Sequence, residues 1–197
     1  MAKARRSSAK RVSAEPGLPN LAVALAAIAI SFAVYAPALQ SPFFSDDLHY
    51  VESNAYIHTI SLENAIAIWS PQSPVVGIVE NYAPVHLTLH SLAWQAFGAR
   101  VLGHHIVNVL LHAAVGFMWI LFFRRLGIAP RIAMWLGAVF LVHPANIEAV
   151  AWISQLKTTS AMVLMLGALA FQPRRPVAAL TCFALALFAK PTAAVAF

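Results

Sequence analysis

The stretch LAVALAAIAISFAVYAPAL, residues 21–39, decides the fold of this chain. It holds no charged side chain and approaches the roughly 20 apolar residues that a helix needs to cross a bilayer. It exceeds the about 7–15 residues of a secretory signal core, so we expect an uncleaved signal anchor. The next residues, QSPFFSDD (40–47), place an acidic pair at the mouth of this span.

The composition of the whole chain predicts a helical membrane protein. Of its 197 residues, 60% are hydrophobic and 10% charged, whereas soluble domains average about 45–50% and about 25%. The charges are clustered, which leaves long uncharged windows, and a β-barrel would show short alternating segments instead. The single cysteine, Cys182, can form no internal disulfide and is interpreted as a small apolar residue.

Four later apolar stretches bring the expected number of spans to about five. They run over residues 104–123, 132–143, 158–171 and 177–190. Segment 40–103 holds no uncharged window long enough to span, so we expect one external loop. The sequence therefore predicts an all-α, polytopic fold, with an incomplete transmembrane domain over 20–197 and a basic, disordered cytoplasmic tail over 1–19.

Two short interfacial helices are expected in the external loop. Apolar residues spaced by four and three positions predict a helix over Leu62–Trp69, which Ser61 can cap. Pro84 begins a second helix, Val85–Phe97, whose polar stripe comprises Thr88, Ser91 and Gln95. Amphipathic helices of this kind lie at the membrane surface. A short transmembrane helix is the alternative for the second.

The basic residues orient the chain and exclude a nucleic-acid partner. The formal net charge is +6, but the lysines and arginines precede the first span or occupy short loops between spans. Placing the N-terminus in the cytoplasm leaves only Arg100, Lys157 and Lys190 outside. This is the positive-inside pattern of a membrane protein.

Asp46 and Asp47 are the candidate catalytic residues. Adjacent side chains point in different directions, which suits a division of labour between them. One carboxylate would act as a base and the other, Asp47 for instance, would bind a divalent metal or orient a partner. The alternative is helix capping or a solvated loop. No cofactor follows with certainty from these residues.

Further polar residues accompany the spans. His143, Glu148 and Lys157 gather at the external ends of the third and fourth spans, with spacing that matches no zinc signature. Lys190 ends the fifth span, where it either snorkels to the interface or binds a lipid phosphate. The side chains of Asn108 and His112 share one helix face and either form helix-to-helix hydrogen bonds or contact substrate.

The order of these motifs resembles the membrane portion of the tetratricopeptide-repeat O-mannosyltransferase-like proteins, in the GT-C glycosyltransferase superfamily. The resemblance covers about residue 36 to the end and rests on the following stretches: FSDD (44–47), YAP (82–84), HIVNVLLH (105–112) and HPANIEAVAWI (143–153). It implies a GT-C-like fold, a catalytic acidic residue in the first external loop, and a polyprenyl-phosphate sugar donor.

Two departures from the family pattern stand out. Ala83, after Tyr82, occupies a position where the family commonly has arginine. If that arginine holds the donor phosphate, this chain has lost the contact or moved it. The later spans and the repeat domain are missing, which suggests an N-terminal fragment.

The function expected from residues and resemblance together is glycosyl transfer on the non-cytoplasmic face. A sugar, for example mannose, would pass from the polyprenyl-phosphate lipid to a hydroxyl of a protein or glycan acceptor. His143, Glu148, Lys157, Lys190, Tyr82, Asn108 and His112 are the expected substrate-binding residues. The bacterial plasma membrane is favoured over the endoplasmic reticulum. The alternatives are a transporter or scaffold and an inactive truncated relative.

Overall fold

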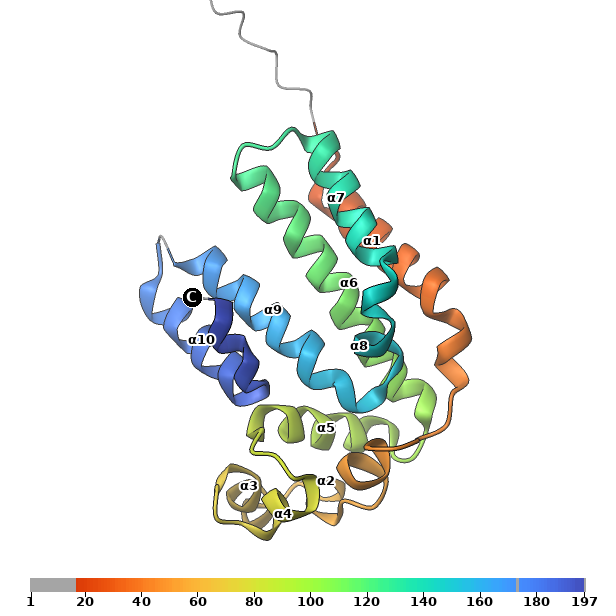
Figure 1. Ribbon diagram of the computed structural model, residues 1–197, viewed down its shortest axis with the longest axis vertical. Helices are drawn as coiled ribbons and strands as arrows, with labels where there is room; N and C mark the ends of the chain where they lie inside the picture. The colour runs from red at the N-terminus through yellow and green to blue at the C-terminus, as the bar shows by residue number, and fades with distance from the viewer. Residues whose placement is uncertain (1–16, 173, 197) are drawn as a thin grey trace, which may run out of the picture.

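A computed structural model describes residues 17–172 and 174–196, which form helices and turns with no strand among them. The predicted all-α fold is therefore confirmed. Long helices lie side by side, and a group of short helices covers one end of them (Figure 1). The tail predicted over 1–19 lies outside the described residues, apart from residues 17–19.

Five longer helices form the main array. They are α1 (Asn20–Tyr35), α6 (Val101–Arg125), α7 (Pro130–Val142), α9 (Leu156–Phe171) and α10 (Pro176–Ala189). Short helical turns extend or join them: η1 (Ala36–Gln40), η3 (Pro144–Asn146), α8 (Ile147–Ala151), η4 (Ile153–Gln155) and η5 (Pro191–Ala196). Helix α6 is central and contacts α1, α7 and α9.

The structure does not confirm the number of five spans. Among the described residues, three helical segments are long and apolar enough to cross a bilayer: Asn20–Gln40, Val101–Arg125 and Ile153–Phe171. A fourth results if α7 and the following turn, which bend by 52°, count as one broken span. Helix α10 has 14 residues, a rise of about 21 Å against a hydrocarbon core of roughly 30 Å.

Segment 40–103, predicted as one external loop, contains more helices than the two predicted. It forms the π-helical turn η2 (Leu48–Glu52), α2 (Ala55–His58), α3 (Leu62–Trp69), α4 (Pro74–Val79) and α5 (Pro84–Phe97). The predicted bounds of α3 are confirmed, and α5 begins one residue early. The additional helices α2 and α4 have four and six residues and are capped by Asn54 and Ser73, so they are too short for a periodic apolar pattern.

The loop has a hydrophobic core of its own. Its buried members are Tyr50, Val51, Ile57, Ile68, Val75, Val79, Leu87 and Ile153. Ile153 comes from the junction between α8 and α9, so the long helices contribute to this core. Leu62 and Ile66, on the apolar face predicted for α3, remain exposed. The loop is thus a packed layer fixed to the helices below it.

The polar stripe predicted for α5 faces protein. The Thr88 hydroxyl accepts from Trp69 Nε1 at 3.2 Å, and Gln95 Nε2 donates to the His58 carbonyl at 3.0 Å. Ser91 is buried. The stripe therefore joins α5 to α2 and α3, because these short helices lie beside it (Figure 1).

Two glycines allow α6 and α7 to approach closely. A Cβ atom on Gly116 would lie 2.3 Å from Leu141 Cδ2, and one on Gly137 would lie 2.2 Å from Ile120 Cγ1. Small residues at such contacts are typical of membrane helices, whose association depends on close packing.

Candidate functional site

The acidic pair lies on a tight turn between η1 and η2. Ser45 has a left-handed backbone with φ of 52°, and the Asp47 N–H donates to the Phe44 carbonyl at 3.1 Å. A non-glycine residue in this conformation costs roughly 1–2 kcal/mol. The turn directs the two carboxylates into different surroundings.

Asp47 is buried and connects the loop to the long helices. Its Oδ1 accepts from the Ser154 N–H at 2.7 Å, and its Oδ2 accepts from the Phe44 N–H at 3.4 Å. Burial raises the pKa of the Asp47 carboxyl above its usual value, and the hydrogen bonds to Ser154 and Phe44 partly oppose that increase. Asp47 therefore holds the break between α8 and α9 against the acidic turn.

Asp46 is the accessible carboxylate of the pair. It is half-buried and lines an open hollow of about 590 Å³ together with His49, Tyr50, Ile78, Val79, Glu80 and Asn81. Glu80, at the end of α4, also has a left-handed backbone, with φ of 50°. The hollow is polar and open, and a small polar substrate group can reach the Asp46 carboxylate there.

Lys157 brings a positive charge to the acidic turn. Its Nζ lies 4.7 Å from the centroid of the Tyr50 ring, which is a cation–π contact. The ammonium is within electrostatic range of Asp46, Asp47 and Glu148. One end of α9 thus presents a cation to the loop carboxylates.

A chain of hydrogen bonds positions Lys190. Its Nζ donates to the Thr158 hydroxyl at 2.8 Å, and that hydroxyl donates to Gln155 Oε1 at 2.7 Å. Gln155 Nε2 then reaches Glu148 Oε1 at 3.4 Å. The Lys190 side chain is therefore directed inward, toward α9, where its charge also acts on Lys157.

His143 gains no such link to the acidic turn. It is exposed, and its Nδ1 accepts from the Ala145 N–H at 3.2 Å, which begins the turn η3. These contacts do not connect His143 with Asp46, and a part of His143 in substrate binding stays a prediction. Glu148, by contrast, belongs to the chain that ends at Lys190.

Asn108 and His112 bind the open backbone at helix breaks. Asn108 Nδ2 donates to the Trp152 carbonyl at 2.9 Å, and His112 Nε2 lies 3.1 Å from the Leu141 carbonyl. Both side chains are buried. These contacts agree with the first alternative for the two residues, hydrogen bonds between helices. A part of Asn108 and His112 in substrate binding stays a prediction.

Tyr82 has an aromatic rather than a polar setting. Its hydroxyl donates to the Trp69 carbonyl at 3.0 Å. Its ring packs edge-on against the Phe188 ring, with 6.3 Å between the two ring centroids. Trp69 also contacts Phe188. Tyr82 therefore joins α3 and α10, and its contact with substrate likewise stays a prediction.

A buried histidine pair in α5 was not predicted from the sequence. His86 and His90 are separated by one helical turn, and their Nε2 atoms are 2.7 Å apart. Burial lowers the pKa of His90 to about 3 and that of His86 well below its usual value. Neutral His86 packs against Tyr50, below the acidic turn. The i, i+4 spacing of the two histidines was the available signal.

No metal centre is assembled by the described residues. Among them, no group of three or more histidine, cysteine, aspartate or glutamate side chains is placed to hold an ion. Asp47, the predicted candidate, already has both oxygens engaged by backbone N–H groups. A divalent metal at Asp47 therefore lacks further ligands from these residues.

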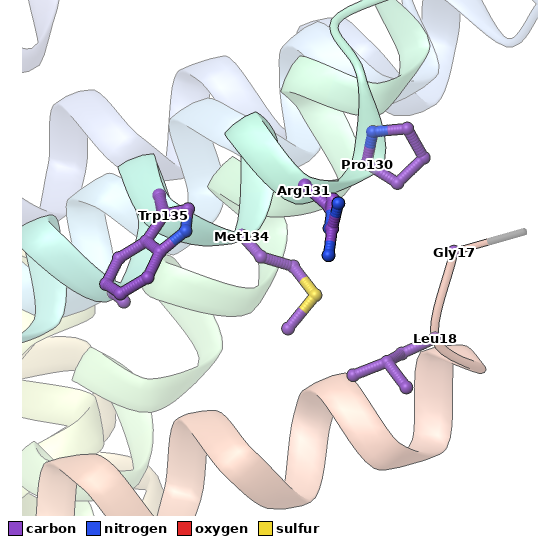
Figure 2. A pocket seen from close by; sticks show the side chains of 7 residues that line it. Gly17, Leu18, Pro130, Arg131, Met134 and Trp135 are labelled. Atoms are coloured by element: carbon purple, nitrogen blue, oxygen red, sulfur yellow. The ribbon is translucent and has the colours of Figure 1, made fainter. Parts of the chain in front are cut away.

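A second hollow lies at the opposite end of α1. It measures about 740 Å³ and is lined by Gly17, Leu18, Pro130, Arg131, Met134, Trp135 and Ala138. Leu18 and Met134 lie on either side of it (Figure 2). This largely apolar hollow contains none of the candidate residues.

The fold is that of a multi-helix protein with membrane-length apolar helices, in which the acidic turn of segment 40–103 lies near Lys157 at one end of α9. The chain is similar to the protein O-mannosyl-transferase Tmtc1 of Drosophila melanogaster, with 30% identity over 152 residues. The match covers 76% of this chain and 17% of that protein. No family model matches the chain, and no solved structure matches it.

The relationship to an O-mannosyl-transferase agrees with the resemblance found in the motifs. The chain spans less than a fifth of the length of this relative, so the activity of the complete relative is not transferred by the match alone. The relative comes from an animal, and the preference for a bacterial membrane therefore receives no support.

Proposed function

We propose that this protein is a glycosyltransferase of the O-mannosyl-transferase type. It moves a hexose such as mannose from a polyprenyl-phosphate lipid to an acceptor hydroxyl, for example of a protein Ser or Thr, on the non-cytoplasmic face. The similarity to Tmtc1 supports the type of reaction. The combination of one accessible carboxylate with two inward-directed lysines supports the location of the site.

The observation that carries the proposal is the different environment of Asp46 and Asp47. Asp47 is buried and bound by backbone N–H groups, so its oxygens are not available to an acceptor. Asp46 lines the open hollow. In this scheme Asp46 is the general base and Asp47 is a positioning residue that fixes the acidic turn.

The proposed reaction needs one proton acceptor, which is Asp46. The Asp46 carboxylate takes the proton of the acceptor hydroxyl while the oxygen of that hydroxyl attacks the anomeric carbon. The bond from that carbon to the donor phosphate oxygen breaks through an oxocarbenium-like state, and the configuration inverts. The polyprenyl phosphate leaves with the bonding electrons, so no general acid is required.

Lys157 and Lys190 would receive the leaving phosphate. Cations placed where charge develops stabilise a transition state more than they stabilise the substrate. Lys157 lies over Tyr50 at the acidic turn, and Lys190 is held through Thr158, Gln155 and Glu148. They would also supply the positive charge that arginine provides in the family and that Ala83 lacks.

An assay with the full-length protein in proteoliposomes tests the proposal. Polyprenyl-phosphate mannose and a Ser/Thr-rich peptide are the substrates, and mannosyl peptide is the product measured. We expect transfer by the wild-type protein and its loss in Asp46→Asn. Flux of a solute without transfer would instead favour the transporter interpretation, and mannose released by hydrolysis would show that water, not the peptide, is the acceptor.

A further inference from the structure

A second charged hollow lies between α6 and the turn that joins α9 to α10. It measures about 300 Å³ and is lined by Arg125, Ala170, Phe171, Arg174 and Arg175. Among the residues that the structure describes, no carboxylate lines it. Three arginines thus line one small volume, and the described residues place no carboxylate beside them in its wall.

Positive-inside topology explains which side of the membrane these arginines occupy, but not their convergence. Arg125 ends α6, whereas Arg174 and Arg175 follow α9 almost fifty residues later. Arg125 Nη1 donates to the Ala170 carbonyl at 2.7 Å, which holds this guanidinium against the end of α9. An arginine has five N–H donors, so most of those of Arg125 remain for a ligand.

Backbone hydrogen bonds to the end of α9 position Arg174 and Arg175. The N–H groups of Arg174 and Arg175 both donate to the Phe171 carbonyl, at 3.0 and 2.8 Å. This fixes two consecutive arginines next to Arg125. A planar guanidinium group binds phosphate through two parallel hydrogen bonds. A set of arginines therefore suits a phosphate group better than a single chloride ion.

The surroundings of the hollow favour a lipid phosphate. Exposed apolar side chains flank the arginines in sequence: Leu126 follows Arg125, and Val177 and Leu180 follow Arg175 on α10. A phosphodiester headgroup at the arginines would leave its acyl chains beside these residues. Basic pockets between membrane helices on the cytoplasmic side bind anionic headgroups in this manner.

We propose that Arg125, Arg174 and Arg175 form a binding site for the headgroup of an anionic phospholipid, on the membrane face opposite the acidic turn. The proposal rests on the membrane setting and is independent of glycosyl transfer. The lipid would join the ends of α6, α9 and α10.

The test uses the detergent-purified full chain and three probes: phosphatidylglycerol, phosphatidylcholine and inorganic phosphate. Native mass spectrometry measures the lipid retained, and thermal unfolding measures the stabilisation. We expect phosphatidylglycerol to be retained and to raise the unfolding midpoint, with no comparable effect of the other two. A shift reproduced by inorganic phosphate alone would reduce the hollow to a simple anion site and overturn the lipid assignment.

Matched variants locate the effect. Arg174→Gln with Arg175→Gln leaves the Arg125–Ala170 bond in place and should weaken phosphatidylglycerol binding by about tenfold or more, since it removes two of the three charges that attract the headgroup. The control, Arg5→Gln with Arg6→Gln, removes the same charge from the N-terminal tail. Equal loss in both pairs would overturn the proposal. If the variant with both glutamines does not fold, Arg174→Lys with Arg175→Lys should still bind phosphatidylglycerol more weakly than wild type. A lysine keeps the charge but cannot form the two parallel hydrogen bonds of a guanidinium group.

Discussion

Asp47 Oδ1 accepts a hydrogen bond from the Ser154 N–H at 2.7 Å, across 107 residues of sequence. The same junction places Ile153 in the hydrophobic core of segment 40–103, and its Trp152 carbonyl accepts a hydrogen bond from Asn108. Three separate contacts, those of Ser154, Ile153 and Trp152, therefore stabilise the break between α8 and α9. This arrangement places Lys157, two residues after the junction, over Tyr50.

Removal of the Asp47 carboxylate should destabilise the protein. Asp47→Ala leaves the buried Ser154 N–H without an acceptor, which costs about 1–3 kcal/mol. Asp47→Asn keeps an amide oxygen at the acceptor position, so its loss should be smaller. Thermal unfolding in detergent provides the measurement, with Glu52→Ala, an exposed acidic residue of the same loop, as the control. Equal midpoints for Asp47→Ala and Glu52→Ala would contradict the structural role.

Asp46→Asn should remove transferase activity without loss of stability. A positioned general base typically contributes about 10²–10⁴-fold to the rate, whereas the carboxylate of half-buried Asp46 accepts a long hydrogen bond from the Ser45 hydroxyl at 3.5 Å and contributes little to stability. Mannosyl transfer by the full-length protein and the unfolding midpoint are measured together. Glu80→Gln, which changes another carboxylate that lines the hollow, is the matched control. Unchanged turnover in Asp46→Asn would eliminate this residue as the base and leave Asp47 as the candidate.

Strong local signals in the sequence predicted much of the fold. Helix α3 was found because Ser61 caps a regular apolar pattern, and α6 because its apolar run is as long as a bilayer. The short helices α2 and α4 have no period to detect, and the loop core joins residues from 50 to 153. Asp46 and Lys190 were found as site candidates, but Gln155 and Thr158, which link Lys190 to Glu148, were not, since side-chain contacts between helices leave no local pattern.

Acid should destabilise the fold through His90. Its folded-state pKa is about 3, below the roughly 6.5 of an unfolded histidine. Between these values the unfolded state binds the additional proton, so stability is present above about pH 6.5 and decreases toward pH 3, by about 1.4 kcal/mol per pH unit for one proton. Asp47 acts oppositely, since its raised pKa favours the folded state at low pH.

The unfolding midpoint measured as a function of pH isolates the histidine contribution. His90→Gln should flatten the decrease between pH 6.5 and 4, because the substituted side chain cannot be protonated. His49→Gln, at the loop hollow, serves as the control. A wild-type midpoint that rises over this range of decreasing pH is the result incompatible with a buried neutral pair.

Cysteine labelling should place the loop outside and the α6–α7 connection inside. Cys182→Ala removes the native thiol, after which Ser53→Cys and Ala129→Cys each introduce one exposed site. The positive-inside distribution predicts that a membrane-impermeant maleimide labels position 53 in intact cells and position 129 only after permeabilisation. The reverse order would refute the proposed topology and, with it, a non-cytoplasmic site.

Loss of the Lys190 charge should weaken binding of the donor lipid. The ammonium is directed inward by Thr158, where it can meet a phosphate as a point charge, and Pro191 prevents the helix from continuing past it. Lys190→Gln should therefore raise the KM for polyprenyl-phosphate mannose in the full-length protein without reducing expression. Thr158→Val should do the same to a smaller degree, since the charge remains but its support is lost. Arg100→Gln, an exposed cation assigned to the same membrane face, is the control. If donor affinity is unchanged in Lys190→Gln, this lysine serves only to bind Thr158, and Lys157 remains as the candidate for the donor phosphate.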